Sequence, residues 1–209
     1  MSMFFNFAPS SGGSPPGPIT YAVWNSADKS SEIVLSAADR TASTTIPPTA
    51  WRSVRGTVGH TTGDRYFEVI VEGTAGGGSP YACVSLVSAA HPLSGFAGTG
   101  GALGWGIHTG GFSLYPGGYA NDIGQIASST RIGVAVLRST SQVKFYTVVD
   151  ATTLNLIYPF DISAADGVSM FPHTSHFTDT VSASTTICAD PADILATTAP
   201  DSCTKGWGA

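Results

Sequence analysis

The stretch RYFEVIVE, from Arg65 to Glu72, has the alternating pattern of a β-strand with one buried face. Successive side chains of a strand point to opposite faces of the sheet. Three apolar side chains therefore share one face and are expected in the core: Phe67, Val69 and Val71. The same period predicts that Glu68 and Glu72 point into solvent from the other face.

Runs of this β type recur along most of the chain, each bounded by turn-forming residues. They are SEIVLS (31–36), RGTVG (55–59), YACVSLVS (81–88), RIGVAVLR (131–138) and QVKFYTVV (142–149). In RIGVAVLR both faces are apolar or small, which predicts a strand in the middle of a packed sheet. Helical periodicity is hard to find, so the sequence indicates an all-β sandwich or barrel.

The composition indicates one domain with a weakly charged surface. A chain of 209 residues suits a single domain, and only 11% of its residues are charged, against roughly a quarter in a typical soluble domain. Such a surface fits either an extracellular β-protein or a subunit covered by neighbours in an assembly. The nine Lys and Arg residues are scattered, which gives nucleic-acid binding little electrostatic basis. No apolar run approaches the roughly 20 residues of a membrane helix, so no membrane insertion is expected.

Two segments flank the predicted sandwich, which we place at residues 21–177. Residues 1–20 form a Pro-, Gly- and Ser-rich arm, and residues 178–209 lose the strand rhythm and are expected to form an irregular tail. The arm carries Phe4, Phe5 and Phe7, which either pack on their own domain or anchor it to another subunit. We favour anchoring. The acidic stretch from Asp150 to Asp201 is expected to aid solubility first and partner docking second.

The sequence offers little support for catalysis or for a cofactor. No Gly-x-Ser-x-Gly elbow occurs, and Glu68 and Glu72 would lie roughly 13 Å apart along one strand, too far for a glycosidase pair. The Gly-rich segment 98–111 lacks the Lys of a phosphate loop, so its glycines are expected to permit tight turns and close sheet packing. We expect no enzyme activity and no cofactor.

Histidines and cysteines give no metal-site pattern. The five histidines are expected in turns or loops, and the pair His173 and His176 has no third ligand nearby. Cys83 lies in an apolar run and is expected to be a buried free thiol. Cys188 and Cys203 are either free or joined by a disulfide that would contribute about 3 kcal/mol.

An almost uncharged aromatic stretch is the best candidate for binding. Between Glu72 and Arg131 the only charged residue is Asp122. Aromatic side chains on a rigid β-scaffold suit recognition of proteins or sugars. The candidate binding residues are Tyr81, Trp105, His108, Tyr115 and Tyr119. Trp105 also fits a core position, and Phe96 and Phe112 are expected to fill the core.

The ordered series of motifs resembles the SPRY-domain family. It comprises WRSVRGTVGHTTGDRYFEVIVEG (51–73), GALGWGIHTGGFSLYPGG (101–118), RIGVAVLRSTSQVKFY (131–146) and VSMFPHTS (168–175). The resemblance implies a bent antiparallel β-sandwich of the concanavalin-like jelly-roll type. The chain departs from the family in its turns, where RSTS stands in the hallmark hairpin and TVVDATTLN replaces an Asn-Gly turn. Because loops carry the family's specificity, no ligand can be transferred.

With VWNSADKSSEIVLSAADRTAS (23–43) ahead of these motifs, the chain resembles most closely SPRY-type domains of bacteriophage and prophage structural proteins. The resemblance implies a non-enzymatic virion component, made in the host cytoplasm, that decorates a capsid or sits on a tail. Its expected partners are other virion subunits, with self-association as a homo-oligomer. The alternative is a module of a tail or fibre that binds a host glycan or receptor.

Overall fold

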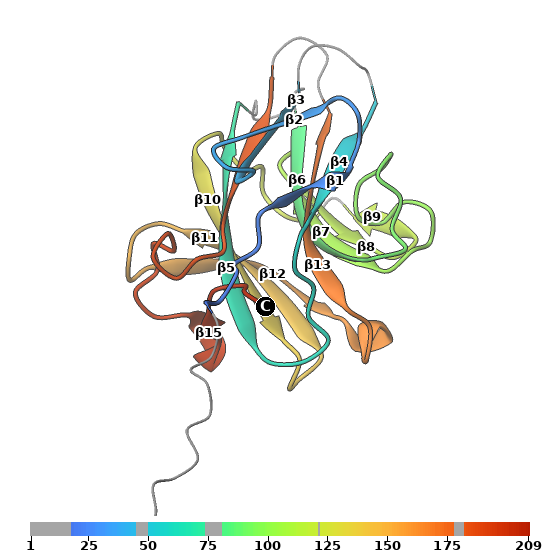
Figure 1. Ribbon diagram of the computed structural model, residues 1–209. Coiled ribbons are helices and arrows are strands. Elements are labelled where there is room, and N and C mark those ends of the chain that lie inside the picture. Colours follow the sequence, from blue (N-terminus) through green and yellow to red (C-terminus); the bar gives the residue numbers. More distant parts are fainter. Residues whose placement is uncertain (1–17, 45–49, 74–80, 121, 178–181) are drawn as a thin grey trace, which may run out of the picture.

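The computed structural model describes residues 18–44, 50–73, 81–120, 122–177 and 182–209. These residues form a sandwich of two sheets that are almost entirely antiparallel (Figure 1). The only helices in this part are two short 3₁₀ helices, Ser163–Ala165 and Pro200–Ser202, and none could cross a membrane. The expected all-β sandwich is confirmed. Phe4, Phe5 and Phe7 lie outside the described residues.

The first sheet has seven strands in the order β1-β4-β13-β6-β7-β8-β9. Their bounds are β1 Trp24–Lys29, β4 Arg52–Gly56, β13 Met170–Phe177, β6 Tyr81–Ser88, β7 Gly104–His108, β8 Phe112–Tyr115 and β9 Gly118–Ala120. Strands far apart in sequence are neighbours here, because β13 lies between β4 and β6. The candidate binding stretch thus supplies one end of this sheet, β6 to β9.

The second sheet has eight strands, seven of them in the order β12-β11-β10-β5-β14-β3-β2. Their bounds are β12 Leu154–Asp161, β11 Gln142–Val148, β10 Thr130–Leu137, β5 Arg65–Glu72, β14 Ser184–Cys188, β3 Thr41–Thr44 and β2 Ile33–Ser36. The short β15, Thr204–Lys205, runs parallel to β5 at its start. The expected central place of RIGVAVLR is confirmed, since β10 pairs with β11 on one side and β5 on the other.

The core between the sheets contains the face of β5 that the alternation predicts. Phe67, Val69 and Val71 are all buried and pack in one cluster with Trp24 and Trp207. Both tryptophans also donate hydrogen bonds to backbone carbonyls, Trp24 to Thr185 at 3.2 Å and Trp207 to Val58 at 2.8 Å. Because a buried indole N–H needs an acceptor, these bonds fix where the rings lie.

The C-terminal residues are part of the sandwich rather than an irregular tail. β14 is hydrogen-bonded to both β5 and β3, so it completes the second sheet from within. Residues 189–203, here called the C-terminal strap, then cross the outer face of that sheet. The strap buries Ile194, Ala196 and Ala199 against Tyr66 and neighbouring side chains. The sequence of β14, STTIC, hides this role because only Ile187 and Cys188 are apolar.

The prediction that Glu68 points into solvent is wrong. Its side chain is fully buried, because the strap covers the face of β5 that alternation assigned to water. Arg131 pairs with the carboxylate at 2.7 Å, and the backbone N–H groups of Leu195 and Ala196 donate to it at 2.8 and 3.1 Å. Glu72 remains partly exposed, with a hydrogen bond from Ser129.

The question of a disulfide is also answered by the fold. Cys188 and Cys203 are both buried and free, as is Cys83. Burial raises the pKa of the Cys83 thiol to about 12, and it also raises the pKa of the other two thiols. The cysteines therefore act as small apolar side chains at neutral pH.

Candidate functional site

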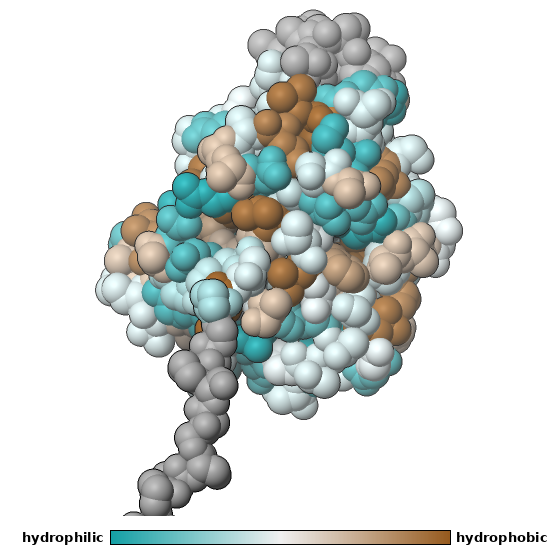
Figure 2. All heavy atoms as spheres, in the orientation of Figure 1, coloured by the Kyte–Doolittle hydropathy of each residue, from teal (hydrophilic) through white to brown (hydrophobic). Residues whose placement is uncertain are grey.

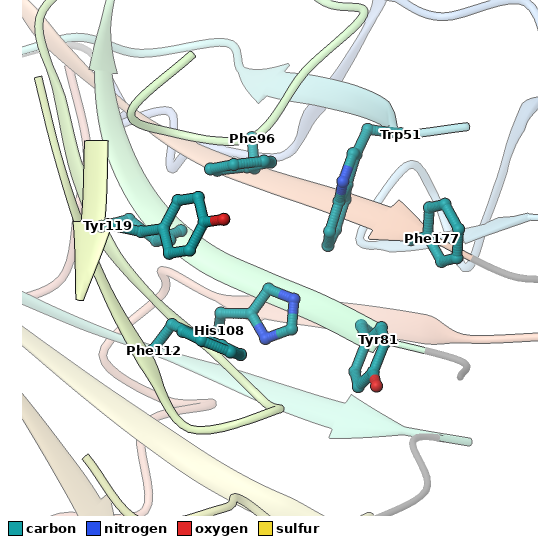
Figure 3. A pocket seen from close by; sticks show the side chains of 8 residues that line it. Trp51, Tyr81, Phe96, His108, Phe112, Tyr119 and Phe177 are labelled. Atoms are coloured by element: carbon teal, nitrogen blue, oxygen red, sulfur yellow. The ribbon is translucent and has the colours of Figure 1, made fainter. Parts of the chain in front are cut away.

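An aromatic pocket opens on the outer face of the first sheet, the face turned away from the core. Its volume is about 280 Å³, and Figure 3 shows its side chains converging from separate strands and loops. The described lining consists of Trp51, Tyr81, Phe96, His108, Phe112, Leu114, Tyr119 and Phe177. A concave site lined mainly by aromatic residues with a few polar groups is the usual form of a binding site.

Strand register explains why these residues meet. Tyr81 of β6 lies opposite Phe177 of β13, and His108 of β7 lies opposite Phe112 of β8. Residues opposite one another, or two apart on one strand, share a face of a sheet. Leu114 and its partner Tyr119 continue the same face onto β9. Trp51, just before β4, closes the pocket from the other side.

The rings pack edge to face, which is the arrangement that aromatic quadrupoles favour. The ring centroids of Trp51 and Phe96 are 5.2 Å apart at an interplanar angle of 65°. The rings of Phe112 and Tyr119 lie 5.5 Å apart at 90°. Trp51 also contacts Phe177 at 5.5 Å, so the wall is continuous around the opening.

His108 is the polar group at the centre of these rings (Figure 3). Burial lowers the pKa of its imidazole to about 4, so the ring is neutral at pH 7. Its Nδ1 accepts a hydrogen bond from the backbone N–H of Gly110 at 2.8 Å, which leaves the ring proton on Nε2. None of the described lining residues carries a charge, so the pocket offers mainly apolar aromatic walls with a few neutral polar groups, the His108 imidazole among them.

Three of the five predicted binding residues, Tyr81, His108 and Tyr119, line this pocket. Tyr115 does not line it, although it is exposed nearby on β8 and its hydroxyl donates to the Tyr119 carbonyl at 3.4 Å. Trp105 is buried in the core between the sheets, because on β7 it alternates with His108 and faces the other way.

The sequence interpretation missed five lining residues. Phe96 and Phe112, expected in the core, are only half-buried and form pocket walls. Trp51, Leu114 and Phe177 were not singled out at all. Phe177 follows the motif VSMFPHTS (168–175) on the same strand, and pairing of that strand with β6 places it opposite Tyr81. No such pairing places Trp51, since it lies outside any strand.

The expectation that all five histidines lie in turns or loops is wrong. His108, His173 and His176 are on strands and buried. His176 faces the space between the sheets, where its Nε2 lies 3.1 Å from the Thr185 hydroxyl, and burial lowers its pKa to about 4. His173 lies on the outer face below a loop that carries the buried His91.

The loop of residues 89–103 covers part of the outer face beside the pocket. Arg55, paired with Asp28 at 2.6 Å, donates to the carbonyls of Ser88 and His91 at 3.3 and 2.6 Å. Gly106 of β7 lies against the backbone of β6 so closely that any added Cβ would collide with Ser85. The close sheet packing expected of the Gly-rich segment is therefore observed here.

Ser85 and His173 form a contact that could be a nucleophile–base pair. The Ser85 hydroxyl lies 2.8 Å from His173 Nδ1, the spacing of a nucleophile and a base. Both side chains are buried, and burial lowers the pKa of His173 well below its usual range. His173 Nε2 has no partner in the described part of the chain, so no carboxylate orients the ring there. The pair therefore lacks the access and the orienting group of a catalytic site. The described residues also hold no cluster of three or more metal-ligating side chains.

Comparison with known proteins places the chain by its fold. No family model and no curated protein matches the sequence. The PSpry domain of TRIM65 matches with a TM-score of 0.62 and 14% identity, over 82% of this chain and 93% of that one. The SPRY domain of human HERC1 matches with a TM-score of 0.62 and 11% identity, over 79% of this chain and 96% of that one.

Stonustoxin also matches, with a TM-score of 0.63 and 14% identity over 80% of this chain. This chain spans only 27% of the stonustoxin chain. Two of these three structures are named as SPRY domains, and both are matched over nearly their full length. The chain is therefore a β-sandwich with a SPRY-like fold.

Proposed function

We propose that the chain is a non-enzymatic binding module that receives an apolar or aromatic side chain of a protein partner in the aromatic pocket. The observation that carries this proposal is a wall of aromatic rings around a neutral His108. A volume of about 280 Å³ lies below the usual range for small-molecule sites, roughly 300–1,000 Å³, and suits one or two inserted side chains. Large aromatic anchors in such pockets dominate many protein interfaces.

A peptide library displayed on a surface tests this proposal. Enriched peptides are expected to share an aromatic or large apolar residue and to bind Tyr119→Ser about tenfold or more weakly. Tyr115→Ser is the matched control, because Tyr115 is also exposed but lies outside the pocket. Failure to enrich any peptide, or equal losses in the two variants, would count against the pocket.

A glycan ligand is the second candidate. Tyr115 and Tyr119 are 40% and 58% exposed, and neighbouring exposed rings can stack on sugars. A glycan array separates the two proposals, because a sugar platform would need both tyrosines whereas the pocket needs Tyr119 alone. Binding of a defined glycan that is lost in both variants would favour this alternative.

The proposed setting is a bacteriophage virion, with the module decorating a capsid or sitting on a tail. This setting rests on the sequence resemblance of residues 23–43 and on the low content of charged residues, 11%, which fits a subunit covered by neighbours. Mass spectrometry of purified particles tests it. Peptides of this chain should be present at many copies per particle, and their absence would contradict the virion role.

A further inference from the structure

The aromatic pocket has a candidate partner within the sequence itself. We infer that it receives the phenylalanines of residues 1–17 from a second copy of this chain, so that copies are linked arm to pocket. The inference rests on the proposed function, because it names the partner of the same pocket. Three observations support it: the chemistry of the two surfaces, the places of the other phenylalanines, and the side of the sandwich from which residue 18 starts.

The two surfaces match in chemistry. Residues 1–17, MSMFFNFAPSSGGSPPG, contain three Phe and no Asp, Glu, Lys, Arg or His. The described pocket lining is equally free of charge, and His108 is neutral at pH 7. No charged side chain has to be desolvated when the two surfaces meet. The free energy gained by burying apolar area is therefore not reduced by such a desolvation cost. An entering Phe ring can also extend the edge-to-face packing of Trp51 and Phe112.

The described part of the chain has no exposed phenylalanine to offer. Of the ten Phe residues in the sequence, seven lie in that part. Each of the seven is buried or half-buried: Phe67, Phe96, Phe112, Phe145, Phe160, Phe171 and Phe177. The other three Phe residues of the sequence are those of the FFNF run, Phe4, Phe5 and Phe7. Asn6 and the peptide carbonyls around it provide acceptors for the Nε2 proton of His108.

The position of residue 18 favours a second copy over the same chain. The first described residues lie against the C-terminus, since Tyr21 bridges Gly208 and the Ala209 N–H donates to Thr20. β15, beside them, belongs to the second sheet, whereas the pocket opens on the outer face of the first. Figure 1 shows β15 and β8–β9 on opposite sides of the sandwich. Phe7 and Pro18 are separated by at most about 40 Å of extended chain, which suffices to cross to a neighbour.

Sedimentation velocity of the full chain tests the link. The wild-type chain is expected to associate as its concentration rises, whereas the full-length triple variant Phe4→Ser, Phe5→Ser, Phe7→Ser stays monomeric. Tyr119→Ser should weaken association about tenfold or more, and the control Tyr115→Ser should leave it unchanged. Circular dichroism shows whether each variant retains its β-structure. A wild-type chain that stays monomeric, or a triple variant that associates like wild type, overturns the inference.

A mixing experiment identifies the direction of the link. The triple Phe variant has a pocket but no aromatic arm, and Tyr119→Ser has the arm but a damaged pocket. Mixed together, they can form one intact contact, so a one-to-one heterodimer is expected at a concentration at which neither variant self-associates. If a synthetic peptide of residues 1–17 binds the triple variant but wild type is monomeric and excludes it, the arm occupies its own pocket and the inference fails.

The library experiment separates failure of this inference from failure of the proposed function. Library peptides that bind in a Tyr119-dependent way, together with association that ignores the three Phe substitutions, would remove only the arm as partner. If neither library peptides nor the 1–17 peptide bind, the pocket itself is not a binding site and both proposals fall.

Discussion

The outer faces of the two sheets differ in how far other residues cover them. On the second sheet the C-terminal strap closes the face and buries Glu68 with Arg131 beneath it. On the first sheet the 89–103 loop covers one part only, and the aromatic pocket stays open beside it. Figure 2 shows apolar side chains scattered between polar ones on the face of the molecule that it presents.

The two faces also differ in their buried ionisable groups. The closed face holds a carboxylate because the strap brings two backbone N–H groups and Arg131 to it. The face with the pocket holds His91, His108 and His173, and burial lowers the pKa of each. The buried carboxylate of the closed face is fully paired, whereas the lining of the aromatic pocket is uncharged and can therefore receive an apolar group.

The largest expected loss of stability comes from removing the buried carboxylate of the closed face. Glu68→Ala leaves Arg131 and the N–H groups of Leu195 and Ala196 without their acceptor, so the free energy of unfolding should fall by about 3–5 kcal/mol. Urea denaturation measures it, and Glu68→Gln serves if the alanine variant does not fold. Glu72→Ala, on the same strand but partly exposed, should cost about 0.5 kcal/mol. Equal losses for Glu68 and Glu72 would mean that the strap does not depend on the buried carboxylate.

Sequence reasoning performed well where local pattern decides structure. The runs that became β5, β6, β10 and β11 have the predicted bounds to within one residue, because turn residues and period-two alternation mark them directly. Only one of the two faces of β5 is as the alternation predicts. Phe67 is in the core as expected, but Glu68 is buried by residues more than 120 positions later in the chain. A local sequence pattern cannot predict that a distant segment will cover this face of the strand.

The pocket was predictable in part for the same reason. Tyr81, His108 and Tyr119 stood out because they lie in an uncharged aromatic stretch. Whether an aromatic residue enters the pocket or the core depends on the phase of its strand, and Trp105 and His108 on β7 fall on opposite faces. Trp51 and Phe177 reach the pocket through β4 and β13, whose pairing joins residues far apart in sequence.

A drop in pH should destabilise the fold in part through His108. The folded-state pKa of His108 is about 4, below its ordinary 6.5, so between these values the unfolded chain binds a proton that the folded chain does not. Stability is thus retained above pH 6.5 and lost as pH falls toward 4, by about 1.4 kcal/mol per pH unit, or about 2 kcal/mol at pH 5. Urea denaturation at pH 7 and pH 5 measures the total loss, to which the other histidines with lowered pKa values also contribute.

His108→Phe isolates the contribution of this histidine. The variant should lose about 2 kcal/mol less than wild type between pH 7 and pH 5, because the phenylalanine ring takes up no proton. Its remaining acid sensitivity is expected to come from the other histidines whose pKa is lowered by burial, which are His60, His91, His173 and His176. If wild type and His108→Phe lose equal stability over this range, the pocket imidazole is not held neutral by burial.

The smallest expected loss of stability is that of a substitution at Asp201, at the exposed end of the closed face. Asp201, near the end of the strap, accepts hydrogen bonds from Lys144 at 3.0 Å and Tyr146 at 2.8 Å, but it is partly exposed. Exposed pairs contribute little, so Asp201→Asn should cost at most about 1 kcal/mol by urea denaturation. Asp39→Asn is the matched control, because Asp39 also has a positive φ, of 62° against 53°. A loss of unfolding free energy at Asp201 as large as that at Glu68 would show that the strap is held along its whole length. The contrast between the buried Glu68 carboxylate and the weakly held end at Asp201 would then be wrong.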